Sequence, residues 1–178
     1  GLEYANQPRW SPDGQQLIYQ RHFMDIQADR LRSNLWLIDV DSGSQQALTT
    51  GARSDSQAAW SPQGDRITYI GQDQQQRSQI MVRWLDSGRE VQVTQSEFSP
   101  SAPTWSPDGR WIVFSRFVPS QSKPLVKALK APKGAEWAPA PTVIDRPVFR
   151  RDGQGLVPQG HRHLFIVPAD GGTPRQLT

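Results

Sequence analysis

The pentapeptide WSPDG occupies residues 10–14 and returns unchanged at residues 105–109. Between these copies, residues 60–64 read WSPQG, so the motif occurs three times in 178 residues. The three tryptophans that open it are 50 and 45 positions apart. A unit that recurs every few tens of residues is typical of a repeat architecture and decides the fold before any single residue does.

The residue types of the motif predict a tight hairpin turn. Proline presets the first central φ of a type I turn, and glycine takes the left-handed conformation that closes the hairpin. Each tryptophan is expected to be the last buried residue before its turn and to pack between neighbouring sheets. The structural motif positions are Trp10, Pro12, Gly14, Trp60, Pro62, Gly64, Trp105, Pro107 and Gly109.

The sequence around each motif repeats as well. A short alternating strand follows the turn, then a strand that is apolar on both faces, then a second turn and an edge strand that ends in threonine. The expected face-sharing pairs are Leu17 and Tyr19, Ile67 and Tyr69, and Ile112 and Phe114, and the closing residues are Thr49, Thr94 and Thr178. Four antiparallel strands in about 45 residues are the size of one β-propeller blade.

We therefore predict an all-β fold in which residues 1–178 form part of a β-propeller. Blade 1 is expected near 6–50, blade 2 near 56–95 and blade 3 near 101–178. Thr94 to Thr178 spans 84 positions where Thr49 to Thr94 spans 45, so blade 3 carries 39 extra residues, near 117–160. A connection of that length is a binding element, a lid or a plain surface excursion.

Composition narrows the classes of partner. The chain has no cysteine, and its net charge of +3 comes from 20 basic and 17 acidic residues that are interspersed. A nucleic-acid surface needs a denser basic stripe, so no nucleic-acid partner is expected. No apolar run reaches the roughly 20 residues of a membrane span, so no membrane partner is expected either. The compartment stays open between bacterial cytoplasm and periplasm.

Recognisable catalytic chemistry is missing from the sequence. It contains no G-x-S-x-G, H-E-x-x-H, Walker A or dinucleotide glycine motif. His161 and His163 are two positions apart, but no third ligand accompanies them, and His22 is distant in sequence. The acidic residues Asp39, Asp41 and Asp86 fall in predicted turns, where they cap main-chain amides. We assign no catalytic, cofactor-binding or metal-binding residue, and no cofactor.

The repeat of W-S-P-D-G, a strand, an L-W-L-I-D strand and a final L-T resembles the TolB-like propeller repeat, over the whole chain outside the insertion. The order RWSPDG, FMDIQADRLRSNLWLIDVDSG, AAWSPQGDRITYI, the long insertion and HRHLFIVPADGGTPRQLT resembles a more specific family. It is similar to the N-terminal propeller of bacterial acylaminoacyl-peptidase-like enzymes, within the prolyl oligopeptidase family of serine peptidases.

This resemblance implies a propeller of usually seven blades that caps a C-terminal α/β-hydrolase domain with a Ser, Asp, His triad. The chain is then a propeller fragment that gates peptide substrates, while the triad lies in the hydrolase domain. A TolB-like periplasmic protein-interaction propeller is the alternative. Three blades are also expected to self-associate through open blade faces lined by Leu35, Leu37, Leu164 and Ile166.

Overall fold

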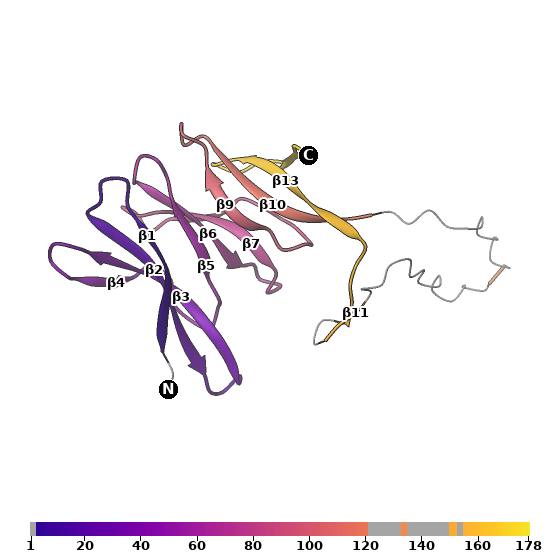
Figure 1. The fold of residues 1–178 in the computed structure, drawn as a ribbon, viewed down its shortest axis with the longest axis horizontal. Helices are drawn as coiled ribbons and strands as arrows, with labels where there is room; N and C mark the ends of the chain where they lie inside the picture. Colours follow the sequence, from indigo (N-terminus) through magenta and orange to yellow (C-terminus); the bar gives the residue numbers. More distant parts are fainter. Residues whose placement is uncertain (1–2, 121–132, 135–149, 153–154) are drawn as a thin grey trace. The chain divides into compact units, whose positions relative to one another are not determined.

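The computed structural model describes residues 3–120, 133–134, 150–152 and 155–178, which form strands and turns but no helix (Figure 1). The chain divides into two compact units, Gly1–Phe117 with Arg162–Thr178, and Val118–His161. Within the second unit, β11 (Arg150–Arg151) and β12 (Gly155–Leu156) form an antiparallel pair. The rest of the 117–160 insertion lies largely outside the described residues.

The first unit contains three four-stranded antiparallel sheets, which we name blades 1, 2 and 3. Blade 1 has the order β1 (Tyr4–Trp10), β2 (Gln16–Asp25), β3 (Arg30–Asp39) and β4 (Gln45–Ala47). Blade 2 has β5 (Ser56–Trp60), β6 (Arg66–Gln72), β7 (Ser78–Trp84) and β8 (Glu90–Gln92). Blade 3 has β9 (Ser101–Trp105), β10 (Trp111–Pro119), β13 (Gly160–Pro168) and β14 (Arg175–Gln176). The predicted all-β fold built of propeller blades is confirmed.

Each pentapeptide forms the expected turn between the first two strands of its blade. In every copy the main-chain N–H of the glycine donates to the carbonyl of the serine three positions earlier, at 3.0, 3.0 and 2.9 Å. Gly14, Gly64 and Gly109 all have φ near +70°, at +73°, +73° and +69°. At Gly109 a Cβ would also lie 2.4 Å from Oε1 of Gln63 in the turn of blade 2, so a larger residue there would displace the end of that side chain.

The closing threonine of each repeat has a structural task. Its hydroxyl oxygen accepts the main-chain N–H of a residue 14 positions earlier, in the third strand of the same blade. Thr49 accepts from Leu35 at 3.0 Å, Thr94 from Ile80 at 2.9 Å and Thr178 from Leu164 at 3.0 Å. The hydroxyl thereby pairs an amide at the point where the short edge strand has ended.

Burial of the second strands shows the order in which the blades pack. In blade 2, the five successive residues 67–71 of β6 are all buried, so both faces of this sheet are covered. In β2 the buried residues include Ile18 and Gln20, whereas in β10 they include Ile112 and Phe114, which occupy the opposite face at equivalent positions. Blades 1 and 3 therefore cover opposite faces of blade 2. The core between blades 1 and 2 consists of Ile18, Leu35, Leu48, Ala58, Ile67, Tyr69 and Met81.

One expectation about the blade faces is wrong. Leu35 and Leu37 are predicted on an open face, but Leu35 is 1% exposed and Leu37 packs against the same core, because their side of β3 faces blade 2. Leu17 and Tyr19 share one face as predicted, and both are only half-buried, because they lie on the face of blade 1 that points away from blade 2. The alternation along β2 is as predicted, and the face that blade 2 covers is the one with Ile18 and Gln20.

The motif tryptophans join neighbouring blades in a repeated way. The indole N–H of Trp60 donates to the carbonyl of Arg9 at 3.0 Å, and that of Trp105 donates to the carbonyl of Ala59 at 3.1 Å. In both cases the acceptor precedes the tryptophan of the preceding blade. Trp105 is 9% exposed, but Trp10 is 59% exposed, so the prediction that Trp10 is buried is wrong. No described blade lies before blade 1 to receive it.

A second bond accompanies each indole contact. Gln7, Gln57 and Ala102 occupy equivalent bulges in the first strands, with φ of +52°, +55° and +52°. The side-chain oxygen of Gln7 accepts the main-chain N–H of Gln57 at 3.0 Å, and that of Gln57 accepts the N–H of Ala102 at 2.6 Å. These bonds fix the register between the first strands of successive blades.

Candidate functional site

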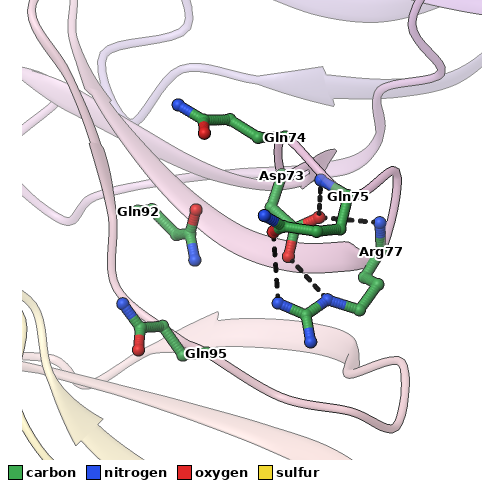
Figure 2. Close-up of a pocket in the computed structure, with 6 residues that line it drawn as sticks. All are labelled: Asp73, Gln74, Gln75, Arg77, Gln92 and Gln95. Carbon is green, nitrogen blue, oxygen red and sulfur yellow. Dashed lines mark hydrogen bonds and ion pairs between the residues drawn. The ribbon is translucent and has the colours of Figure 1, made fainter.

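A polar pocket lies at one end of blade 2 (Figure 2). Its residues come from two segments, the turn between β6 and β7, and the end of β8 with the chain that follows it. The lining residues are Asp73, Gln74, Gln75, Arg77, Gln92 and Gln95. Its volume of about 310 Å³ lies at the lower end of the range for small-ligand sites.

Asp73 organises the turn that forms one wall. Its Oδ1 accepts the main-chain N–H groups of Gln75 and Arg77, both at 2.9 Å. Its Oδ2 accepts Nε of Arg77 at 3.0 Å and Nε2 of Gln79 at 3.2 Å. Loss of hydration raises the pKa of Asp73, but the hydrogen bonds from Arg77 and Gln79 outweigh it and hold the pKa below 3.8. The carboxylate is therefore charged and fully engaged at neutral pH.

The side chain of Gln79 links the two walls of the pocket, which are the turn after β6 and the segment after β8. This side chain is fully buried, and its Nε2 donates to Asp73 and to the carbonyl of Ser96 at 2.9 Å. Its Oε1 accepts the hydroxyl of Thr94 and the N–H of Ser96, both at 2.9 Å. One amide thus uses all four of its hydrogen-bonding positions. The turn after β6 and the segment after β8 are held at a fixed separation as a result.

The groups left over for a ligand are amides. The side chains of Gln74 and Gln95 have no hydrogen-bond partner among the described residues. Gln92 donates Nε2 to the carbonyl of Thr94 at 2.7 Å, and Gln75 accepts from Arg77 at 3.3 Å. Gln92 therefore keeps an acceptor and Gln75 keeps donors. The pocket can bind a polar ligand, but it holds no nucleophile with a positioned base.

Replacement of Asp73 by Asn is expected to reduce stability at neutral pH and to have a smaller effect in acid. Because the folded pKa of Asp73 is lowered, its contribution is present above the unfolded pKa and is lost as pH falls through the folded pKa. Urea unfolding of both proteins between pH 2 and 7 measures this. Asp41→Asn, an exposed change of the same charge, is the control. A difference that stays constant with pH would contradict the role given to Asp73.

A second charged cluster lies between blades 1 and 2. Nε of Arg53 donates to Oδ2 of Asp55 at 2.9 Å, and its NH2 group donates to the hydroxyl of Tyr69 at 2.9 Å and to Glu90 at 3.2 Å. Tyr69 also donates to Glu90. Burial raises the pKa of Asp55 and that of Tyr69. Asp55 and Tyr69 are fully buried, whereas the side chains of Arg53 and Glu90 are 31% and 22% exposed. We therefore assign this cluster a structural role, as a clamp between blades.

The histidines considered for a metal do not form a ligand set. Among the described residues, no three His, Asp or Glu side chains converge as metal ligands do. His161 is exposed, and Nδ1 of His163 lies 3.4 Å from the hydroxyl of Thr178. That distance exceeds the 2.6–3.2 Å of an activated nucleophile. The same hydroxyl oxygen already accepts the N–H of Leu164.

Sequence reasoning missed the pocket. The glutamine-rich stretch QDQQQRSQ at residues 72–79 was the available signal, since five amides and a charged pair within eight residues are unusual between two apolar strands. Its partner wall, with Gln92 and Gln95, is more than a dozen residues away. Only the fold brings the two segments together.

Two curated proteins are similar to parts of this chain, and no family model matches it. The chain is 24% identical over 75 residues to the uncharacterized peptidase YuxL of Bacillus subtilis, covering 42% of this chain and 11% of that protein. It is 32% identical over 60 residues to dipeptidyl-peptidase 5 of Porphyromonas endodontalis, covering 34% of this chain and 9% of that protein. The matched part is thus about a tenth of the length of either relative.

Solved structures match nearly the whole chain. An acylaminoacyl peptidase of Pyrococcus horikoshii superimposes on 99% of this chain and 25% of its own, at 13% identity and a TM-score of 0.71. A TolB structure from Agrobacterium tumefaciens matches 95% of this chain and 47% of its own, at 21% identity and a TM-score of 0.59. The chain therefore has the propeller fold found in acylaminoacyl peptidases and in TolB. Both curated relatives are peptidases, so a propeller segment of a peptidase-like protein is supported.

Proposed function

We propose that this chain is the non-catalytic propeller part of a serine peptidase of the acylaminoacyl-peptidase type, in the prolyl oligopeptidase family. The observation that carries the proposal is the match of three consecutive blades to the propeller of an acylaminoacyl peptidase over almost the entire chain. The peptidase relatives found by sequence support the same assignment. The described residues contribute a binding pocket and stacked sheets, and the reaction belongs to a separate hydrolase domain.

The role of such a propeller is to control access. A ring of blades over a hydrolase site admits a short or unfolded peptide, whereas a folded protein is too wide to enter. Selection by size needs no reactive group in the blades, only a rigid stack. The indole and glutamine bonds between blades supply that rigidity.

The purified chain is expected to show no turnover of aminoacyl or acylaminoacyl p-nitroanilides above background, because no positioned nucleophile is present among its described residues. The complete reading frame, expressed as a control, is expected to react with a fluorophosphonate at a serine outside residues 1–178. Deleting the blades from that protein should let it cleave larger polypeptides. Inhibitor-sensitive turnover by the 178-residue chain alone would contradict the proposal.

A TolB-like interaction propeller without a hydrolase is the second candidate, and the match to a TolB structure favours it. The two functions differ in one observable feature of the gene. A G-x-S-x-G motif in the same reading frame supports the peptidase. A reading frame without one, and a protein that no fluorophosphonate labels, supports the interaction propeller.

A further inference from the structure

We propose that the pocket on blade 2 binds the main chain of an extended, uncharged peptide segment. The proposal deepens the function given above and rests on it for the identity of the ligand, since it names the place on the propeller where a peptide is held. It is carried by the chemistry of the lining residues (Figure 2), by the rigidity of the two walls and by the edge strand β8, whose last residue, Gln92, lines the pocket.

The available groups match those of a peptide unit. A carboxamide carries donors and an acceptor, as the main chain does, so an amide pair can bond a peptide unit at both its N–H and its C=O. Gln74 and Gln95 are uncommitted, Gln92 retains Oε1, and Gln75 retains its amino group. Figure 2 shows these side chains around one open space, with Gln92 and Gln95 on one side and the turn on the other.

The charge of the pocket favours a neutral ligand. The one carboxylate, on Asp73, is paired with the one guanidinium, on Arg77, at 3.0 Å. The Arg77 side chain is 48% exposed, but the Asp73 carboxylate offsets its charge, so the lining residues carry no net charge that would select an anion or a cation. None of the six lining residues is aromatic, so the pocket offers no flat ring surface for stacking by a sugar or a nucleobase. A neutral chain of alternating donors and acceptors remains as the best match.

The two walls of the pocket are preformed in the absence of a ligand. Gln79 and Asp73 fix the distance between the turn and the segment after β8 through bonds that are already complete. Binding therefore requires only the surface amides to become ordered, which limits the entropic cost. A peptide with small side chains can therefore bind through its main chain alone, with low affinity.

The position of β8 adds a second mode of contact. β8 (Glu90–Gln92) is the edge of its sheet, in the order β5-β6-β7-β8, so one side of its main chain is unpaired within the sheet. An extended peptide that adds to this edge would run from β8 past Gln92 toward Gln95. Main-chain pairing and side-chain amide bonds then act on the same segment.

Comparison with blade 1 shows that the pocket is not a general property of these blades. A shift of 45 residues places Ala47 at the position of Gln92 and Thr50 at that of Gln95. The equivalent of Gln79 is Asn34, whose shorter amide leaves its buried Nδ2 without a partner. Blade 1 therefore lacks both the ligand-facing amides and the bridge beneath them.

The test is an NMR titration of the chain with N-acetyl-tetra-alanine amide, observed through the side-chain NH2 signals of glutamine. The peptide is expected to shift the signals of Gln74, Gln92 and Gln95. Gln95→Met keeps the length of an exposed side chain and removes its amide, and it should weaken binding about fivefold, as expected for one hydrogen bond. Gln27→Met, in the turn between β2 and β3 of blade 1, is the matched control and should change affinity less than twofold.

Maltotriose, titrated in parallel, is expected to leave the pocket signals unchanged. The proposal is overturned if the peptide shifts none of the pocket glutamines, if Gln95→Met binds as tightly as the parent, or if maltotriose binds there and the peptide does not. Thermal melts verify that Gln95→Met is folded. The absence of a hydrolase in the reading frame would overturn the peptidase assignment and leave this binding result intact, so the two failures are distinguishable.

Discussion

Trp105→Ala is expected to destabilise the chain by about 3–5 kcal/mol, as for the loss of a large aromatic side chain from a packed core. Trp105 is 9% exposed and its indole donates to the carbonyl of Ala59 in blade 2. The guanidinium of Arg66 lies 5.1 Å from the centre of its ring. The substitution removes apolar packing, a hydrogen bond and a cation–π contact between blades 2 and 3 at once.

Trp10→Ala is the matched control, because Trp10 opens the same pentapeptide but is 59% exposed. We expect a change below about 1 kcal/mol, as for a surface substitution. Urea unfolding followed by circular dichroism suits both variants, since removing tryptophan alters fluorescence directly. Equal effects of the two substitutions would show that burial between blades does not decide the role of the motif tryptophan.

Arg53→Met is expected to cost about 3–5 kcal/mol at neutral pH, the range for breaking a buried ion pair from one side. The substitution leaves Asp55 fully buried without its guanidinium partner. Burial already raises the pKa of Asp55. An acid with a raised folded pKa contributes stability that is present below its unfolded pKa and is lost as pH rises. The variant should therefore recover part of its stability as the pH is lowered toward about 4, the unfolded pKa of Asp.

The double variant Arg53→Met/Asp55→Asn distinguishes the interaction energy of the ion pair from the effect of each charge alone. Removing both charges should restore a substantial share of the loss, because an apolar or neutral pair at such a site is often as stable as the ion pair. The junction between blades 2 and 3 supports this, since Phe98 and Pro100 stand at the positions equivalent to Arg53 and Asp55. Urea midpoints across pH 4 to 8 provide the measurement. Additive losses in the double variant would contradict the coupling.

Local turn chemistry made the fold predictable. Proline and glycine at fixed positions determine the hairpin through main-chain conformation, and the observed φ of Gly14 and Gly64 is the one required. The period of two then identifies which residues share a face of each strand. The turn residues and the period of two both depend on residues that are close in the chain, so they can be recognised from the sequence alone.

Burial of a particular face could not be predicted in the same way. The sequence of β2 alternates, but nothing in it states whether Leu17 or Ile18 faces another blade. That depends on which side of the sheet the next blade covers, a relation between residues tens of positions apart. The same applies to the pocket, where Gln79 near the start of β7 bonds to Ser96, which follows the next strand, β8. Paired segments of this kind leave no periodic pattern.

Self-association is expected from the ends of the blade stack. Light scattering should report a mass above that of a monomer at micromolar concentration, because apolar surface is exposed at both ends, at Trp10 and at Leu164. Trp10→Glu should shift the chain toward the monomer. Ile26→Glu, at an exposed residue in a turn of blade 1, is the control. A monomer mass at every concentration would contradict the expectation.

The indole bonds give the stack a direction. Trp60 and Trp105 both donate backward, toward the blade before them, so blade 1 presents the equivalent donor in Trp10 and blade 3 presents the equivalent carbonyl in Thr104. The two ends are complementary to each other and not to themselves. Head-to-tail contact is the arrangement that satisfies both, and such contacts either close into a ring or continue as a filament. A blade of a second copy and a further blade of a longer propeller would both contact this chain through the same indole-to-carbonyl bond.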